Sequence, residues 1–175
     1  MNDMTKKSRV SFVAGGSGGI GSEICRRLIE DGNQVYFTYH SNQSKAETLR
    51  DSLKSQGDVA CGKMDVTDHA QIEAAMADAM SIYGRIDTVV FASGAHIDQP
   101  FVVDITDEQW QDVFNVELRG FTRLVKVALP ILRDSGEGSL VSVVSFAPYH
   151  YPPGDALSAV PKAGIEVLCR AIAKE

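Results

Sequence analysis

A glycine-rich stretch near the N-terminus constrains the fold of this chain more than any other feature. Following the apolar run Arg9–Val13, it comprises Ala14-Gly15-Gly16-Ser17-Gly18-Gly19-Ile20-Gly21. The residues after it place apolar side chains near a 3.6-residue period, which predicts the order strand, glycine loop, helix. Glycines let a diphosphate approach the backbone, and the free N–H groups of a helix N-terminus favour anions. The stretch therefore indicates a nucleotide site, while a flexible turn is the alternative interpretation of a glycine loop alone.

Short apolar runs and helical patterns alternate along the rest of the chain. Strands are expected near residues 9–14, 34–39, 58–62, 87–92 and 138–144. Helices are expected near residues 19–31, 43–56, 68–83 and 106–134, with a last helical stretch over about 155–175. This βαβ series predicts an α/β fold, a Rossmann-like doubly wound parallel sheet with helices on both faces. If the first and fourth strands are neighbours, the glycine stretch and Ala92-Ser93-Gly94 line one crevice at the strand ends.

Length and composition favour a single domain over residues 1–175, because 44% of the residues are hydrophobic and can form a substantial core. The sequence contains no interdomain linker, repeat or low-complexity segment. The last helical stretch reaches Glu175 without a C-cap glycine, a pattern expected of a natural chain that continues further.

Charge and residue usage exclude several function classes. The net charge of −6 and the absence of a basic block argue against nucleic-acid binding. No apolar run is long enough to span a membrane, and no signal-peptide core follows residues 1–7, so a cytoplasmic protein without membrane contact is expected. Cys25, Cys61 and Cys169 are widely spaced and are expected to be reduced and packed. The scattered histidines predict no metal site.

Together these motifs resemble the short-chain dehydrogenase/reductase family, in particular its 3-oxoacyl-carrier-protein-reductase-like members, over essentially the whole chain. Residues 14–21 are similar to the family's T-G-x-x-x-G-I-G loop, with Ala14 in place of threonine. Phe91-Ala92-Ser93-Gly94 stands where the family has N-N-A-G, and only the glycine is kept. The resemblance implies that side-chain hydrogen bonds from those asparagines, which would steady the strand end, are lost here.

Two further positions carry the resemblance. Asp65-Val66 resembles the pair whose acidic residue contacts adenine, whereas the alternative is that Asp65 caps a turn with Thr67. Asn115 in Asn115-Val116-x-x-x-Gly120 is similar to the helix asparagine that supports a water and the active-site lysine. A solvated helix position is the alternative for Asn115.

The resemblance implies a catalytic serine, tyrosine and lysine. Ser145 and Lys162 match the first and the last, but the tyrosine position holds Ser158. In the family the serine binds the substrate carbonyl oxygen, the phenol exchanges its proton, and the lysine binds the nicotinamide ribose. A serine hydroxyl lacks the reach of the ring and is a much poorer acid than a phenol. A residual reductase would therefore work through water or another residue.

The segment after Ser145 offers Tyr149 and Tyr151 as substitute proton donors, although packing of a proline-rich loop is the favoured interpretation. His150 is expected at the surface. Pro161 is compatible with a first helical turn, so the last helix is expected to begin near Ser158. Ser158 would then be an N-cap rather than a catalytic group.

The end of the second expected strand bears on the choice of cofactor. It carries His40, Ser41 and Asn42, which can donate hydrogen bonds, and no carboxylate that would repel a 2′-phosphate. The resemblance therefore implies NADP, with NAD possible. Gly18 occupies a position that is arginine in many NADP-using relatives, and Lys45 is a further cation nearby, more commonly a solvated one.

The implied function is an NADP(H)-dependent oxidoreductase acting on a small carbonyl or alcohol substrate. The alternative is a catalytically silent nucleotide-binding subunit or a truncated family member. The last helix and the 106–134 helix are the family's usual oligomer surfaces, so a homodimer or homotetramer is implied. His96 and Asp98 could contact substrate, but exposed loop positions are favoured for both.

Overall fold

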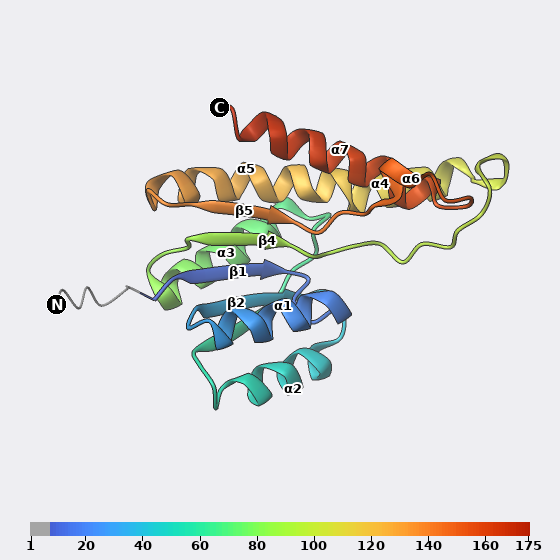
Figure 1. Ribbon diagram of the computed structural model, residues 1–175. Helices are drawn as coiled ribbons and strands as arrows, with labels where there is room; N and C mark the ends of the chain where they lie inside the picture. The colour runs from blue at the N-terminus through green and yellow to red at the C-terminus, as the bar shows by residue number, and fades with distance from the viewer. Residues whose placement is uncertain (1–7) are drawn as a thin grey trace.

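The computed structural model describes residues 8–175, so segment 1–7, considered above for a signal peptide, lies outside the described residues. A parallel sheet of five strands in the order β3-β2-β1-β4-β5 forms the centre of the molecule (Figure 1). The strands are β1 (Val10–Ala14), β2 (Gln34–Tyr39), β3 (Val59–Lys63), β4 (Thr88–Phe91) and β5 (Ser139–Ser142). The predicted α/β architecture is confirmed.

Helices cover both faces of this sheet. Helices α1 (Gly19–Glu30) and α2 (Gln43–Leu53) lie on one face, and α3 (His69–Tyr83), α5 (Leu118–Asp134) and α7 (Ala156–Ile172) lie on the other. The remaining elements are η1 (Val102–Asp104), α4 (Asp107–Val116) and α6 (Ala147–His150). The segment between β4 and α4 runs out beyond the strand ends toward α6 (Figure 1).

Each face of the sheet has its own apolar core. Phe12 packs into the cluster under α3, α5 and α7, and the next residue, Val13, packs into the cluster under α1 and α2. This alternation follows from the two-residue period of a strand. Cys25 belongs to the second cluster, and burial raises the pKa of its thiol to about 12. The packed, unpaired state expected for this cysteine is confirmed.

The single helix expected over residues 106–134 is wrong, because two helices meet at Glu117. Its ψ of −74° departs from the helical value of about −42°. The Phe121 N–H still donates to the Glu117 carbonyl at 3.0 Å. The interruption is therefore a local backbone distortion between α4 and α5.

The helical stretch expected over about 155–175 is confirmed, but the interpretation of Ser158 as its N-cap is wrong. Helix α7 begins at Ala156 with Asp155 as its N-cap, so Ser158 lies inside the first turn and Pro161 lies in the interior. The Ser158 N–H donates to the Asp155 carbonyl at 3.1 Å. Pro161 has no N–H to donate to the turn before it, but its ring is buried. Packing of the buried ring therefore stabilises Pro161 in the helix interior, whereas helix propensity favours proline in the first turn.

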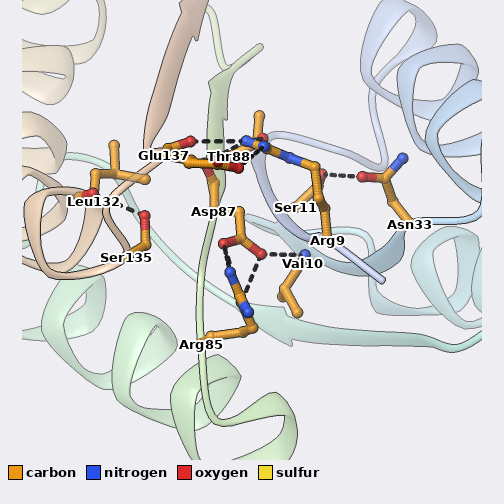
Figure 2. A network of polar contacts seen from close by, with 10 residues as sticks. All are labelled: Arg9, Val10, Ser11, Asn33, Arg85, Asp87, Thr88, Leu132, Ser135 and Glu137. Carbon is orange, nitrogen blue, oxygen red and sulfur yellow. Dashed lines mark hydrogen bonds and ion pairs between the residues drawn. The ribbon is translucent and has the colours of Figure 1, made fainter. Parts of the chain in front are cut away.

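A polar network joins the amino-terminal ends of β1, β4 and β5, away from the carboxyl ends of these strands (Figure 2). Asp87, 1% exposed, accepts a 2.9 Å hydrogen bond from the Val10 N–H and pairs with Arg85. Arg9 donates to the carbonyls of Asp87 at 3.3 Å and Glu137 at 3.0 Å. Burial alone would raise the pKa of Asp87, but Arg85 and the Val10 N–H lower it below its usual value.

Candidate functional site

The glycine loop and the loop after β4 meet at the carboxyl ends of neighbouring strands. β1 pairs with β4, with Ala14 opposite Phe91, as the crevice prediction requires. Gly15 has a φ of +79°, and a Cβ there would lie 2.8 Å from Ser93 Oγ. A cavity of about 650 Å³ lies at this junction, and both loops line it. The prediction that the two loops share one crevice is confirmed.

The glycine loop is held by backbone contacts. The Gly15 N–H donates to Thr38 Oγ1 at 3.1 Å, and the Gly18 N–H donates to the Gly15 carbonyl at 3.0 Å. Helix α1 then starts at Gly19 without a side-chain cap, and a Cβ on Gly19 would meet nothing within 4 Å. Uncapped first-turn N–H groups beside open space fit the diphosphate of a dinucleotide.

Most of the predicted cofactor residues line this cavity, namely Gly15, Ser17, Gly18, His40, Ser41, Asn42, Asp65, Val66, Ala92, Ser93 and Gly94. The other three glycine-loop positions, Gly19, Ile20 and Gly21, are the first residues of α1. The Ile20 side chain is 62% exposed. Gly21 packs on the loop, since a Cβ there would lie 2.3 Å from the Gly15 carbonyl oxygen.

Asp65 makes the turn contacts that were the alternative to an adenine contact. Its Oδ1 accepts from the Thr67 N–H and from Thr67 Oγ1, both at 2.8 Å. Its Oδ2 lies 3.5 Å from His40 Nε2. Burial alone would raise the pKa of Asp65, but the Thr67 hydrogen bonds and His40 lower it overall. The contact of Asp65 with adenine stays a prediction.

The start of α2 adds further polar groups to the cavity. Asn42 is the N-cap of α2, and its Oδ1 accepts from the Lys45 N–H at 2.9 Å, so its amide NH2 remains available to a ligand. The Lys45 side chain also lines the cavity. A second cavity of about 520 Å³ between α1 and α2 shares Ser17, Asn42 and Lys45 with the first and adds Arg26.

A buried ion pair holds the predicted catalytic lysine. Lys162 Nζ lies 2.6 Å from Glu117 Oε2, and the two side chains are 14% and 1% exposed. The other carboxylate oxygen, Oε1, accepts from the Ala95 N–H at 3.0 Å. Sequence reasoning missed Glu117, which links Lys162 to the loop after β4.

Asn115 has a different partner from the one that the resemblance implies. Its Oδ1 accepts from Arg123 Nη2 at 3.0 Å, and its carbonyl accepts from Arg123 Nη1 at 3.3 Å. The structure therefore places Glu117, rather than Asn115, against the ammonium of Lys162.

Ser145 and Ser158 are both half-buried. Ser145 Oγ accepts from the Ala147 N–H at 3.1 Å, which leaves its own hydrogen free to donate. Ser158 and Lys162 are four residues apart on α7 and so share one face of the helix. Within residues 8–175, no hydrogen bond engages the Ser158 hydroxyl.

The tyrosines after Ser145 lie at the surface. The Tyr149 hydroxyl donates to Glu166 on α7, and this bond raises the pKa of Tyr149. Tyr151 is 80% exposed, so the packing interpretation is wrong for that residue. His150, His96 and Asp98 are exposed, as expected.

Across residues 8–175, no helix combines the length and the apolarity that crossing a bilayer requires. Over the same residues, no group of three histidine, cysteine, aspartate or glutamate side chains is arranged to hold a metal ion.

Comparison with known proteins places this chain in a family. The short chain dehydrogenase family model matches residues 9–175. A 3-oxoacyl-acyl-carrier-protein reductase from Staphylococcus aureus is 27% identical over 171 residues, which are 97% of this chain and 69% of the relative.

Solved structures of similar proteins have the same fold. A short chain dehydrogenase from Mycobacterium smegmatis has a TM-score of 0.88 and 31% identity, covering 95% of this chain and 71% of that one. A carveol dehydrogenase from Mycobacterium avium in complex with NAD has a TM-score of 0.88 and 25% identity, covering 94% of this chain. The chain spans 64% of the length of that dehydrogenase.

Proposed function

The chain belongs to the short chain dehydrogenase family, and we propose that it is an NADP(H)-dependent oxidoreductase that acts on a small carbonyl or alcohol. The observation that carries this proposal is the cavity of about 650 Å³ between the glycine loop and the loop after β4, which Glu117 links to Lys162. The names of the similar proteins support the class of reaction, and the NAD complex of the carveol dehydrogenase supports a nicotinamide ligand.

The dinucleotide would lie across the strand ends. The uncapped N–H groups at the start of α1 would bind its diphosphate, and the loop 92–95 would border the nicotinamide half. At the adenine half, His40, Ser41 and the Asn42 amide would donate to a 2′-phosphate. Lys45 and Arg26 supply positive charge around the same region, which favours NADP over NAD.

When bound, the nicotinamide would supply or accept a hydride. Because one ammonium hydrogen of Lys162 goes to Glu117, two remain for the hydroxyls of the nicotinamide ribose. Ser145 can donate its free hydrogen to a substrate carbonyl oxygen. The Ser158 hydroxyl, on the same helix face as Lys162, can pass a proton only as part of a chain with water, because its own acidity is weak.

The second candidate is a nucleotide-binding subunit without catalysis. The observation that favours it is Ser158 at the tyrosine position of the family's catalytic set. We propose a single NAD(P)-binding domain over residues 1–175 in a cytoplasmic homo-oligomer in either case. The exposed Val160 and Val167 on α7 provide apolar surface for a second subunit. Light scattering would detect a homodimer or homotetramer as a doubled or quadrupled mass.

A turnover assay distinguishes the two candidates. Purified protein is incubated with NADPH or NADH and a panel of aldehydes and ketones of increasing size, and the loss of reduced nicotinamide is followed. Turnover that depends on Lys162, tested with Lys162→Met, supports the oxidoreductase. Cofactor binding without turnover on any carbonyl supports the silent subunit.

A further inference from the structure

Glu117 is an acidic side chain buried at the junction of two helices. It is 1% exposed, and the backbone distortion between α4 and α5 falls on this residue. Its two oxygens have different partners on different elements, namely the Lys162 ammonium on α7 and the Ala95 N–H in the loop after β4. One carboxylate therefore connects three parts of the chain that are distant in sequence.

Burial makes both contacts necessary. A carboxylate removed from water is costly unless it is paired and hydrogen-bonded, and charge-assisted bonds are the strong ones. The 2.6 Å distance to Lys162 Nζ and the 3.0 Å distance to the Ala95 nitrogen satisfy one oxygen each. Without Glu117, the Lys162 ammonium would lose its charged partner in a site where only 14% of its side chain is exposed.

The contact with the loop replaces support that the loop itself lacks. Ala92 and Ser93 stand where asparagine side chains would steady the strand end, and neither can make the same bonds. Glu117 instead supplies an acceptor to the Ala95 N–H of this loop. The fit is close, since a Cβ on Gly94 would lie 3.1 Å from Glu117 Oε1.

We propose that Glu117 is a positioning residue that holds the Lys162 ammonium and the backbone of residues 92–95 in one arrangement for the nicotinamide ribose of a dinucleotide. The identity of the ligand rests on the proposed function, whereas the contacts of Glu117 with Lys162 and Ala95 exist in the free protein. The role requires two acceptor oxygens. Glutamine has one acceptor oxygen and an NH2 group, so Glu117→Gln can serve only one of the two donors.

The first test uses the free protein and NMR. In the wild type, the paired Lys162 ammonium is expected to give a slowly exchanging Nζ signal, and the Ala95 amide is expected to be protected from hydrogen exchange. In Glu117→Gln, either the Nζ signal disappears or the Ala95 amide exchanges about tenfold faster, because one donor loses its acceptor. Glu108→Gln, an exposed change on α4, is the matched control and should alter neither signal. Unchanged Nζ and Ala95 signals in Glu117→Gln would overturn the proposal.

A second variant separates the two contacts and guards against a folding defect. Lys162→Gln removes the ammonium but leaves an NH2 donor for Glu117 Oε2, so the Ala95 amide should stay protected. Loss of protection at Ala95 in this variant, with exchange elsewhere unchanged, would contradict the inference that the two Glu117 oxygens bind their partners independently.

The effect of these substitutions on cofactor affinity is measured by calorimetric titration with NADPH. We expect both Glu117→Gln and Lys162→Gln to weaken binding about tenfold, while Glu108→Gln binds like the wild type. Equal affinity of Glu117→Gln and the wild type would overturn the positioning role and leave the proposed function standing. A wild type that binds no dinucleotide would overturn the proposed function. The NMR signals would still decide whether Glu117 holds both Lys162 and the Ala95 amide.

Discussion

His40 Nε2 lies 3.5 Å from Asp65 Oδ2, where β2 and β3 end side by side in the sheet. β2 itself ends without an acidic residue, but this pairing brings a carboxylate from the next strand to the proposed 2′-phosphate position. We therefore expect the choice between NADP and NAD to depend on the balance between His40 and Lys45 on one side and Asp65 on the other.

Asp65→Asn should shift this balance toward NADPH. Asparagine keeps the Oδ1 acceptor for Thr67, so the turn is retained, while the charge facing His40 is removed. Removing about 1 kcal/mol of repulsion at the phosphate should raise NADPH affinity about fivefold relative to NADH in parallel titrations. Equal weakening of both cofactors would show instead that Asp65 acts through adenine.

Lys45→Ala tests the opposite charge. Loss of a charge-assisted contact with the 2′-phosphate should weaken NADPH binding about tenfold and leave NADH binding unchanged. Lys54→Ala, which removes an exposed lysine just past the end of α2, is the control for net charge. If the two lysine variants bind NADPH equally, Lys45 has no part in phosphate binding.

Ser158→Tyr should raise carbonyl-reductase turnover, because a phenol restores a general acid on the helix face that carries Lys162. General acid catalysis is worth about 10²–10⁴-fold, so an increase in kcat of at least about tenfold is expected in steady-state assays. Ser158→Phe adds the same ring without the hydroxyl and should show no increase. No gain in a folded Ser158→Tyr variant that binds cofactor would rule out the missing acid as the explanation.

Asp87→Asn should destabilise the fold without altering the cofactor cavity. Arg85 would keep its charge but lose its buried partner, and breaking such a pair costs about 3 kcal/mol. Because the pKa of Asp87 is lowered in the folded state, its stabilisation is present at neutral pH and is lost as the pH falls through the folded-state value.

Denaturant unfolding at pH 7 and pH 3 checks whether the stabilisation by Asp87 is lost as the pH falls. The difference in unfolding free energy between wild type and Asp87→Asn should be largest at pH 7 and smaller at pH 3. Asp134→Asn, an exposed change at the end of α5, should have little effect at either pH. A difference that grows on acidification would contradict the lowered pKa.

Much of the fold was predictable from local pattern. The alternation of Phe12 and Val13, the positive φ of Gly15 and the Asn42 cap of α2 are local properties that strand period and helix capping encode directly. The neighbouring position of β1 and β4 followed from the doubly wound topology. The assignment of Ser158 as the N-cap of α7 shows the limit, because burial of Pro161 inside the helix is a tertiary effect that helix propensity does not contain.

The catalytic side of the site was less predictable, because its main contact joins residues 45 positions apart. The motif around Asn115 pointed to a neighbouring residue of the same helix region, whereas the direct contact with Lys162 comes from Glu117. A usable signal was present, since Glu117 falls on the helical stripe of buried residues Val113, Phe121 and Leu124. A charge on such a stripe requires a buried partner, and Lys162 is that partner.

The central claim is that the crevice between the glycine loop and the loop after β4 binds a dinucleotide, and calorimetric titration with NADPH and with NADH tests it most directly. The account predicts saturable binding with higher affinity for NADPH, and loss of binding in Gly15→Val, whose side chain would enter the space of Ser93. If the wild-type protein, shown to be folded by circular dichroism, binds neither cofactor, the dinucleotide site does not exist.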